Sequence, residues 1–261
     1  LKVRLSDRKE AKEFKILVAG CGTGKQVVNT ARRFPHSKIT AIDLSKSSIS
    51  FAKRKAKELN ISNVDFMIGD ILELKSSKEK FDFIECCGVL HHLENPEKGF
   101  KILSEMLTKK GLMLIALYSE HARFNVNIAR KVIKKAKLED TREDILKFRN
   151  YIIETNDELL NPLRYRVIND NTIHINDFYS LSEFRDLVFH KKENQFNLRQ
   201  ISKIIDKFKM EFIGFEIDNY ILDDFIKING IENLYSLDKW DIYEKENPNT
   251  FIGMYQFWLQ K

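Results

Sequence analysis

The chain has 261 residues, 43% of them hydrophobic, and its 44 basic and 38 acidic side chains give a net charge of +6. This length and apolar content favour one domain with a large insertion and a sizeable core. The longest apolar runs are strand-length, far short of the ~20 residues that a membrane span needs. Three Cys residues argue against a disulfide framework and for the reducing cytoplasm as the location.

The basic excess is mostly Lys and is dispersed among Glu and Asp. Nucleic-acid-binding proteins tend to gather basic side chains on one stripe. The densest group, residues 130–137, has the spacing of a solvated helix face. The charge pattern therefore argues against a nucleic-acid partner. The first residue is Leu1 rather than Met, which suggests that a preceding segment is missing or was removed.

The first motif along the chain is Gly20-Cys21-Gly22-Thr23-Gly24, directly behind the apolar run 15–19. An apolar strand that ends in glycines and opens a helix is typical of nucleotide binding, because glycine lets the backbone turn sharply and approach a ligand closely. The next apolar run, residues 38–43, ends in Asp43. A carboxylate ~20 residues beyond the glycines is placed to bind the hydroxyls of a ribose.

Two cofactor classes use this geometry. A dinucleotide-binding loop reads Gly-X-Gly-X-X-Gly/Ala, whereas the sixth position here is Lys25, which blocks the close helix packing that a third small residue allows. The pattern Gly-X-Gly-X-Gly instead resembles motif I of the class I S-adenosylmethionine (SAM) methyltransferases. A glycine-rich turn without a ligand is the remaining alternative.

Further segments follow in the order of that family: the run 65–70 that ends in Asp70, the strand 81–88, the segment Val89-Leu-His-His-Leu-Glu-Asn-Pro96, and Lys109-Lys-Gly111 before the strand 112–118. The resemblance covers residues 14–118. It implies SAM as the cofactor and S-adenosylhomocysteine (SAH) as the product. It also implies that Asp43 binds the ribose, Asp70 the adenine amino group, and Ile71 the ring. The cofactor-binding residues implied are Gly20, Cys21, Gly22, Thr23, Gly24, Gln26, Asp43, Leu44, Gly69, Asp70, Ile71, Cys87, Gly88, Val89 and His92.

The alternation of strand and helix up to residue 118 predicts an α/β fold with a parallel sheet and right-handed crossovers. Helix signals lie at 26–33, 48–59 and 96–107, with Ser45 or Ser47 as a cap of the second helix. Runs 210–217 and 251–259 are predicted as strands six and seven. The resemblance implies a Rossmann-like, seven-stranded, mostly parallel sheet with an antiparallel last strand. The predicted parts are a SAM-binding core (1–118), a mostly helical insertion for the acceptor (119–198) and the remainder of the core (199–261).

Helical spacing within the insertion predicts one helix through residues 126–136, a second from Asp140 or Thr141, and a third capped by Ser182. Another helix is expected to open at Asn197. Later segments, among them 177–190 and 253–258, also resemble a bacterial group in which a methyltransferase domain follows tetratricopeptide repeats. The repeats themselves are absent from this sequence.

Ligands of open α/β sheets bind beyond the carboxyl ends of the strands, so the acceptor is expected after strands four and five. The candidate catalytic residues are His91, His92, Tyr118 and His121. Paired His can line the cofactor, act as a base or bind metal, but no matching ligand spacing accompanies them and no metal is expected. Adjacent Cys86 and Cys87 point to opposite faces of a strand, which argues against thiol–metalloid chemistry.

The acceptor-binding candidates combine one strand-end residue with polar residues of the insertion: Tyr118, Arg123, Tyr179, Arg185 and His190. Asp186, His190 and Glu193 have the spacing of one helix face, which faces either the pocket or solvent. Two arginines in a closed pocket favour an acceptor with a carboxylate or phosphate. The predicted function is methyl transfer to a small polar, anionic acceptor under a helical cap. The alternatives are a protein or RNA methyltransferase and a SAM-binding regulatory module without turnover.

Overall fold

The computed structural model describes residues 13–168, 171–190 and 193–261, and the contacts divide the chain into two compact units. The sheet unit comprises Leu1–Ser119 and Asn194–Lys261, and the insertion unit comprises Glu120–Glu193. The chain therefore leaves the sheet unit once, after Ser119, and returns to it at Asn194. Each unit has its own hydrophobic core.

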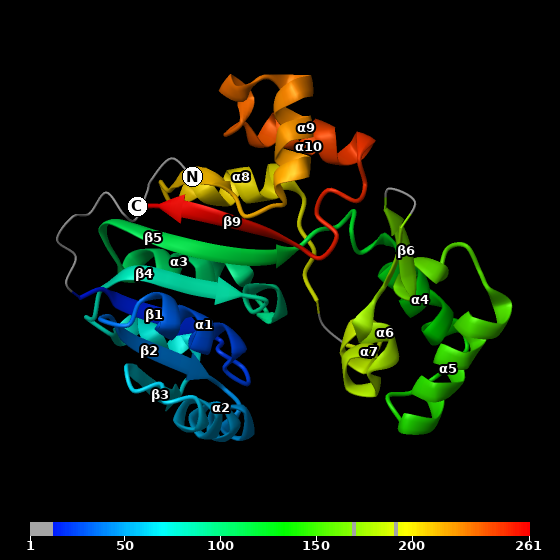
Figure 1. Cartoon of the computed structure of the whole chain (residues 1–261), viewed down its shortest axis with the longest axis horizontal. Coiled ribbons are helices and arrows are strands. Elements are labelled where there is room, and N and C mark those ends of the chain that lie inside the picture. Colours follow the sequence, from blue (N-terminus) through cyan, green and yellow to red (C-terminus); the bar gives the residue numbers. More distant parts are fainter. Residues whose placement is uncertain (1–12, 169–170, 191–192) are drawn as a thin grey trace. The chain divides into compact units, whose positions relative to one another are not determined.

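A seven-stranded sheet forms the centre of the sheet unit, in the order β3-β2-β1-β4-β5-β9-β8 (Figure 1). Neighbouring strands are parallel except at β9, which runs antiparallel to both β5 and β8. This arrangement confirms the predicted fold, including its antiparallel last strand. The strands are β1 (Lys15–Ala19), β2 (Lys38–Asp43), β3 (Val64–Ile68), β4 (Phe81–Cys87), β5 (Leu107–Tyr118), β8 (Glu211–Phe215) and β9 (Met254–Gln260).

Helices cover both faces of the sheet, which is why residues 16–19 of β1 and 112–117 of β5 are continuous apolar runs rather than alternating ones. One face packs against α1 (Lys25–Arg33) and α2 (Lys46–Glu58), whose buried side chains share a core with Ile16, Val18 and Trp258. The other face packs against four helices. These are α3 (Pro96–Met106), α8 (Leu198–Lys207), α9 (Asn219–Asn229) and α10 (Leu237–Glu246).

Short-range signals set several helix starts. The Ser45 hydroxyl accepts the Ser48 N–H at the start of α2, as predicted, and Pro96 is the first residue of α3. Asn197 forms a capping box with Gln200 at the start of α8. Short 3-10 turns lie at η2 (Ile71–Ser76), η3 (Leu90–His92) and η5 (Ile231–Asn233).

The insertion unit is mostly helical, as predicted, and packs around the buried rings of Phe148, Phe178 and Phe184. It also contains an antiparallel hairpin that the sequence pattern did not reveal. The unit comprises α4 (Phe124–Lys135), α5 (Arg142–Thr155), η4 (Asn161–Leu163), β6 (Tyr165–Ile168), β7 (Asn171–His174), α6 (Asn176–Tyr179) and α7 (Leu181–Val188).

Three expectations for the chain after β5 need correction. Ser180 rather than Ser182 caps α7, because its hydroxyl accepts the Glu183 N–H. Helix α7 ends at Val188, so the residues spaced as Asp186, His190 and Glu193 do not share one helix face. Strand β9 begins at Met254 rather than at residue 251.

Hydrogen bonds within the sheet unit hold the two chain segments that lead into and out of the insertion unit. Ser119 forms an isolated parallel bridge with Phe196, whose N–H donates to the Tyr118 carbonyl at 2.9 Å. The Ser119 hydroxyl is buried and donates to Glu244 of α10 at 2.7 Å. Asn194 donates from its backbone to the His91 carbonyl at 2.8 Å. The departing and returning segments therefore lie side by side.

Candidate functional site

The glycine loop between β1 and α1 takes a backbone path that L side chains rarely follow. Gly20, Gly22 and Gly24 have φ values of +80°, +52° and +91°. A Cβ at Gly20 would lie 2.2 Å from Val89 Cγ2, and one at Gly24 would lie 2.8 Å from Ala52 Cβ. Gly20 therefore lets the loop approach the segment after β4, and Gly24 lets it approach α2.

Asp43 fixes this loop to the end of β2. Its Oδ2 accepts the Gly22 N–H at 2.8 Å, and its Oδ1 accepts the Ser45 N–H at 2.8 Å. Each carboxylate oxygen has a second acceptor position. Asp43 can thus hold the loop in place and still accept a hydrogen bond from a ligand hydroxyl.

The end of β3 lies beside the end of β2, because the Gly69 N–H donates to the Asp43 carbonyl at 3.1 Å. Asp70 caps η2 by accepting the Leu72 N–H at 2.7 Å, and Ile71 behind it is buried. Leu44 is 68% exposed. An acidic side chain and an apolar one are thus available beyond these two strands, as the adenine of a nucleoside requires.

The backbone at this edge of the sheet has room for a cofactor. A Cβ added to Gly22, Gly69 or Gly88 would meet no heavy atom within 4 Å. Open space above these glycines, with the Asp43 carboxylate beside them, fits an adenosine ligand that contacts the chain through backbone groups. The residues predicted to bind SAM are therefore compatible with it.

Three of the four candidate catalytic residues lie together in the sheet unit. The His91 ring stacks on Tyr118 with centroids 3.9 Å apart, and His92 meets the His91 ring edge-on at 4.3 Å. His91 has no exposed surface, so in this structure it packs the loop after β4. His121 belongs to the insertion unit. Catalytic roles for these residues stay a prediction.

The two arginines expected to bind the acceptor are each paired inside the insertion unit. Arg123 Nε lies 3.3 Å from Glu193 Oε1, and both side chains are buried. Glu193 also accepts from Arg130 at 2.9 Å. Arg185 forms a two-pronged ion pair with Asp140. The expectation of an anionic acceptor, which came from these arginines, thereby loses its support.

The remaining acceptor candidates lie in different surroundings. The Tyr179 hydroxyl is 3.1 Å from His174 Nδ1, and the Tyr179 side chain is exposed. His190 is exposed and follows the end of α7. Tyr118 is half-buried at the end of β5. Their contact with an acceptor stays a prediction.

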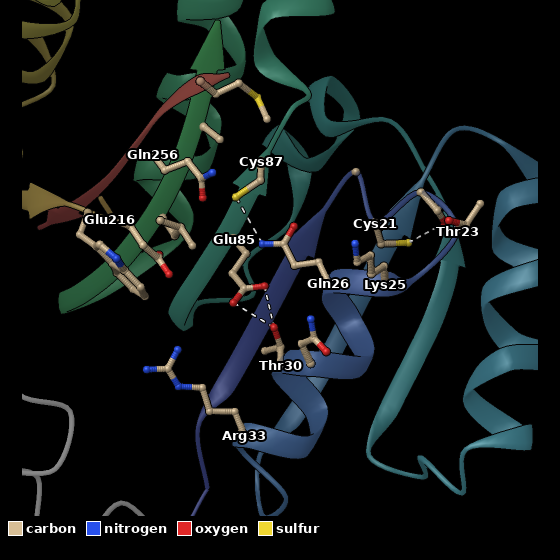
Figure 2. A pocket seen from close by; sticks show the side chains of 17 residues that line it. Cys21, Thr23, Lys25, Gln26, Thr30, Arg33, Glu85, Cys87, Glu216 and Gln256 are labelled. Carbon is tan, nitrogen blue, oxygen red and sulfur yellow. Dashed lines mark hydrogen bonds between the residues drawn. The ribbon is translucent and has the colours of Figure 1, made fainter. Parts of the chain in front are cut away.

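A pocket of about 620 Å³ adjoins the glycine loop on the α1 face of the sheet (Figure 2). It begins at the loop and continues between α1 and the strands β4, β5 and β9. It contains Cys21, Gln26 and Cys87, which were predicted to bind the cofactor, together with polar residues that the sequence analysis did not single out. These are Asn29, Thr30, Arg33, Glu85, Glu216 and Gln256.

Glu85 is the buried carboxyl group of this pocket. The Thr30 hydroxyl lies 2.8 and 3.0 Å from its two oxygens, as Figure 2 shows. Burial raises the pKa of Glu85 to about 7, although the Thr30 hydroxyl, the Gln26 amide and the Arg33 charge oppose that shift. Residues 83–87 are apolar except for Glu85, and this charged residue inside a strand was the signal that could have identified it.

The neighbouring thiols are not poised as nucleophiles. Gln26 Nε2 donates to Cys87 Sγ at 3.3 Å, and burial raises the pKa of Cys87 to about 11. Burial raises the pKa of Cys21 to about 11 as well. Both groups therefore stay protonated near neutral pH, where a thiolate would be needed for attack or metal binding.

We expect Glu85→Gln to stabilise the sheet unit at high pH. The folded pKa of about 7 exceeds the ordinary value of 4.5, so the unfolded chain releases this proton first as the pH rises. The free energy of unfolding of the parent should therefore fall as the pH rises from 4.5 to about 7. Above the folded pKa the total loss should reach about 3 kcal/mol. Urea unfolding at about pH 4 and about pH 8 checks this. Equal pH dependence of both proteins would contradict it.

The nearby groups that also titrate or carry charge are Cys87 on the same strand, Arg33 on α1 and Glu216 beyond β8. Glu85→Gln leaves all three in place. The difference in pH dependence between the parent and Glu85→Gln therefore measures the effect of Glu85 ionisation alone.

Two other kinds of site, a membrane span and a metal centre, are absent from the described parts of the chain. No helix there is long and apolar enough to cross a membrane. Residues 13–168, 171–190 and 193–261 contain no group of three or more His, Cys, Asp or Glu side chains placed to hold a metal ion.

Among solved structures, PKMT2 from Rickettsia typhi resembles this chain with a TM-score of 0.68 at 18% identity, covering 96% of this chain and 48% of that one. A second structure of the same protein, in complex with AdoHcy, gives a TM-score of 0.67 at 19% identity, covering 96% and 49%. At such identities the likeness concerns the fold, and it extends over both units.

Two curated relatives show how the sequence is shared. An uncharacterized protein of Synechococcus is 27% identical over 256 residues, which are 94% of this chain and 60% of that protein. A probable (S)-tetrahydroprotoberberine N-methyltransferase 2 of Papaver bracteatum is 29% identical over 110 residues, which are 42% of this chain and 30% of that enzyme. The chain thus spans less than two thirds of either relative.

The family model described as a methyltransferase domain matches residues 10–172, more than half of the chain. The match contains the glycine loop, Asp43, Asp70 and the segment after β4, where the cofactor is predicted to bind. The resemblance to the group with tetratricopeptide repeats stays a prediction. This chain belongs to the methyltransferase domain family.

Proposed function

We propose that this chain transfers the methyl group of SAM to a small polar molecule. The pocket beside the glycine loop carries this proposal. Its volume of about 620 Å³ falls within the roughly 300–1,000 Å³ of small-molecule sites. Because it contains Gly20, Gly22 and Cys87 of the predicted cofactor site, a molecule in the pocket would lie next to bound cofactor.

SAM is the cofactor and SAH the product, as predicted. Membership of the methyltransferase family confirms this, and the glycine loop with Asp43 provides a compatible site. When bound, SAM supplies a methyl group that its sulfonium has already activated. The chain's own task is therefore to align an acceptor and exclude water, which can lower the barrier by several kcal/mol.

Within this proposal, residues 119–198 contribute to acceptor binding, while residues 1–118 and 199–261 hold the cofactor. The insertion leaves the sheet after Tyr118, at the carboxyl end of β5, where ligands of open α/β sheets bind. Its length also exceeds that of an ordinary connection. The name of the Papaver relative, an N-methyltransferase of an alkaloid, agrees with a small acceptor.

Arg185→Ala tests the contribution of the insertion. The Arg185–Asp140 pair is largely exposed and contributes little to folding, so the variant should fold normally. Because the Arg185 guanidinium is engaged by Asp140, we expect acceptor turnover and SAM affinity near those of the parent. Steady-state assays with calorimetry of SAM binding measure both. A loss of turnover with normal SAM affinity would show instead that Arg185 takes part in acceptor binding.

Arg123→Ala is a less direct variant, because the buried Glu193 carboxylate would lose one of its two arginines. Some of its effect would then come from a destabilised insertion unit, by roughly 1–3 kcal/mol. Thermal unfolding of this variant separates that contribution from a loss of acceptor binding.

The proposed function itself is tested with SAM labelled in its methyl group. The protein is incubated with small-molecule, protein and RNA fractions in turn, and labelled products are separated by size. We expect label in the small-molecule fraction. Label in protein or RNA would favour the macromolecular alternative, and SAM binding with no transfer to any fraction would favour a regulatory module.

A further inference from the structure

The floor of the pocket is an ordered array on three strands. The strand register aligns Glu85 of β4 with Leu114 of β5, and Leu114 with Trp258 of β9. The next row toward the cofactor edge aligns Cys87, Ala116 and Gln256 in the same way. The pocket therefore has two ends. The cofactor end lies at Cys87, and the other end lies at Glu85, one row further from the cofactor edge.

The cofactor end and the Glu85 end differ in chemistry. Around Glu85 the floor is apolar, with buried Leu114 and Trp258, and Trp258 stacks on Phe83. The wall on the α1 side contributes the Thr30 hydroxyl. No residue predicted to contact SAM lies in the Glu85 row. This end is thus a separate compartment with one buried acid and an apolar floor.

Glu85 dominates the charge inside the pocket. It is 6% exposed, whereas the other charged lining residues, Lys25, Arg33 and Glu216, are exposed to solvent. Exposed charges are screened by water and salt, and a buried charge is screened much less. Within the described parts of the chain, Glu85 forms no ion pair with a Lys, Arg or His side chain.

A buried carboxylate of this kind has spare capacity for a cation. Thr30 supplies one hydroxyl, shared between both oxygens, and the Gln26 amide supplies a further donor. An ionised carboxylate offers about four acceptor positions. Burial raises the pKa of Glu85 to about 7, because a charged carboxylate without a cation is costly in this environment. A bound ammonium group would offset that cost.

We propose that Glu85 is the counter-ion of an ammonium group on the methyl acceptor, whose apolar body rests on Leu114 and Trp258. This inference rests on the proposed function and narrows its substrate class to amine-bearing molecules. It replaces the anionic acceptor that was expected from Arg123 and Arg185, both of which are engaged by carboxylates.

Three probes of similar shape and different charge test the inference: 2-phenylethylamine, 2-phenylethanol and 3-phenylpropanoate. Each is titrated calorimetrically into the full chain with saturating SAH at about pH 8, where Glu85 is ionised and the amine still carries a proton. We expect the amine to bind at least tenfold more tightly than the alcohol, and the carboxylate to bind least.

The variant Glu85→Gln should abolish that preference, because it keeps the shape and loses the charge. The amine should lose at least tenfold in affinity, while the alcohol and SAH bind as before. Glu105→Gln, on exposed α3 surface, is the matched control and should change nothing. In the parent protein, amine affinity should also fall as the pH is lowered to about 5.5, since Glu85 becomes protonated. In Glu85→Gln this fall should be absent.

Equal affinity for the three probes, tighter binding of the carboxylate, or an unchanged amine preference in Glu85→Gln would overturn the inference. Normal SAH binding in that same experiment would leave the proposed methyl transfer intact. Failure of the parent protein to bind SAH would instead overturn the proposed function, and the acceptor assignment with it. Retention of SAH binding by Glu85→Gln also shows that the variant is folded.

Discussion

Replacing Asp43 with Ala is expected to weaken SAM binding by roughly 1–3 kcal/mol, a rise in Kd of about five- to 150-fold. Two effects act together. The ribose hydroxyls lose a charged acceptor, and the glycine loop loses the carboxylate that accepts the Gly22 and Ser45 N–H groups at 2.8 Å each. Calorimetric titration with SAM measures the change.

Two further variants separate these effects. Asp43→Asn keeps one acceptor oxygen and should fall between the parent and Asp43→Ala. Asp65→Ala removes an exposed carboxylate from the neighbouring strand β3 and should bind SAM as the parent does. Unchanged affinity in Asp43→Ala would show that SAM does not use this edge of the sheet.

Glu244→Ala is expected to lower the free energy of unfolding of the sheet unit by about 2–5 kcal/mol. Glu244 is 1% exposed and accepts the Ser119 hydroxyl at 2.7 Å and the Tyr255 hydroxyl at 2.6 Å. The Ala variant removes the acceptor of both buried hydroxyls and leaves a cavity. The same contacts raise the pKa of Tyr255 strongly, because burial and the Glu244 carboxylate both disfavour its ionised form.

Tryptophan fluorescence during urea unfolding measures this loss selectively. The chain has two Trp residues, Trp240 and Trp258, and both lie in the sheet unit. Glu246→Ala, on the same helix but exposed, should change the unfolding curve little. An Ala variant of Glu244 as stable as that control would mean that the three groups contribute no net stability.

The first half of the sheet could be predicted from the sequence because its signals are local. Each of the strands β1, β2 and β4 is an apolar run, and the first two end in a glycine loop or an Asp within a few residues. Asp43 could be singled out as a candidate ribose ligand from its spacing of ~20 residues beyond the glycines, and that role stays a prediction. Helices α9 and α10 gave no such signal and were not predicted.

The pocket and the ion pairs could not be predicted, because they depend on partners distant in the chain. The role proposed for Glu85 depends on the strand register, which aligns it with Leu114 and Leu114 with Trp258. Arg185 reads as a candidate ligand in the sequence, but its partner Asp140 lies on the segment before another helix. Loop regions such as 155–176 carry no period from which a hairpin could be inferred.

The bridge between Ser119 and Phe196 means that the sheet unit holds the two ends of the insertion as immediate neighbours. The 74 residues Glu120–Glu193 are therefore equivalent to one long loop whose two ends are held together. Closing such a loop depends only weakly on its length, with about 0.6 kcal/mol for each doubling. This point of the fold can therefore accept insertions of very different size and sequence. Under the proposed function, exchange of this one segment would change substrate choice and leave the strand ends that hold the cofactor unaltered.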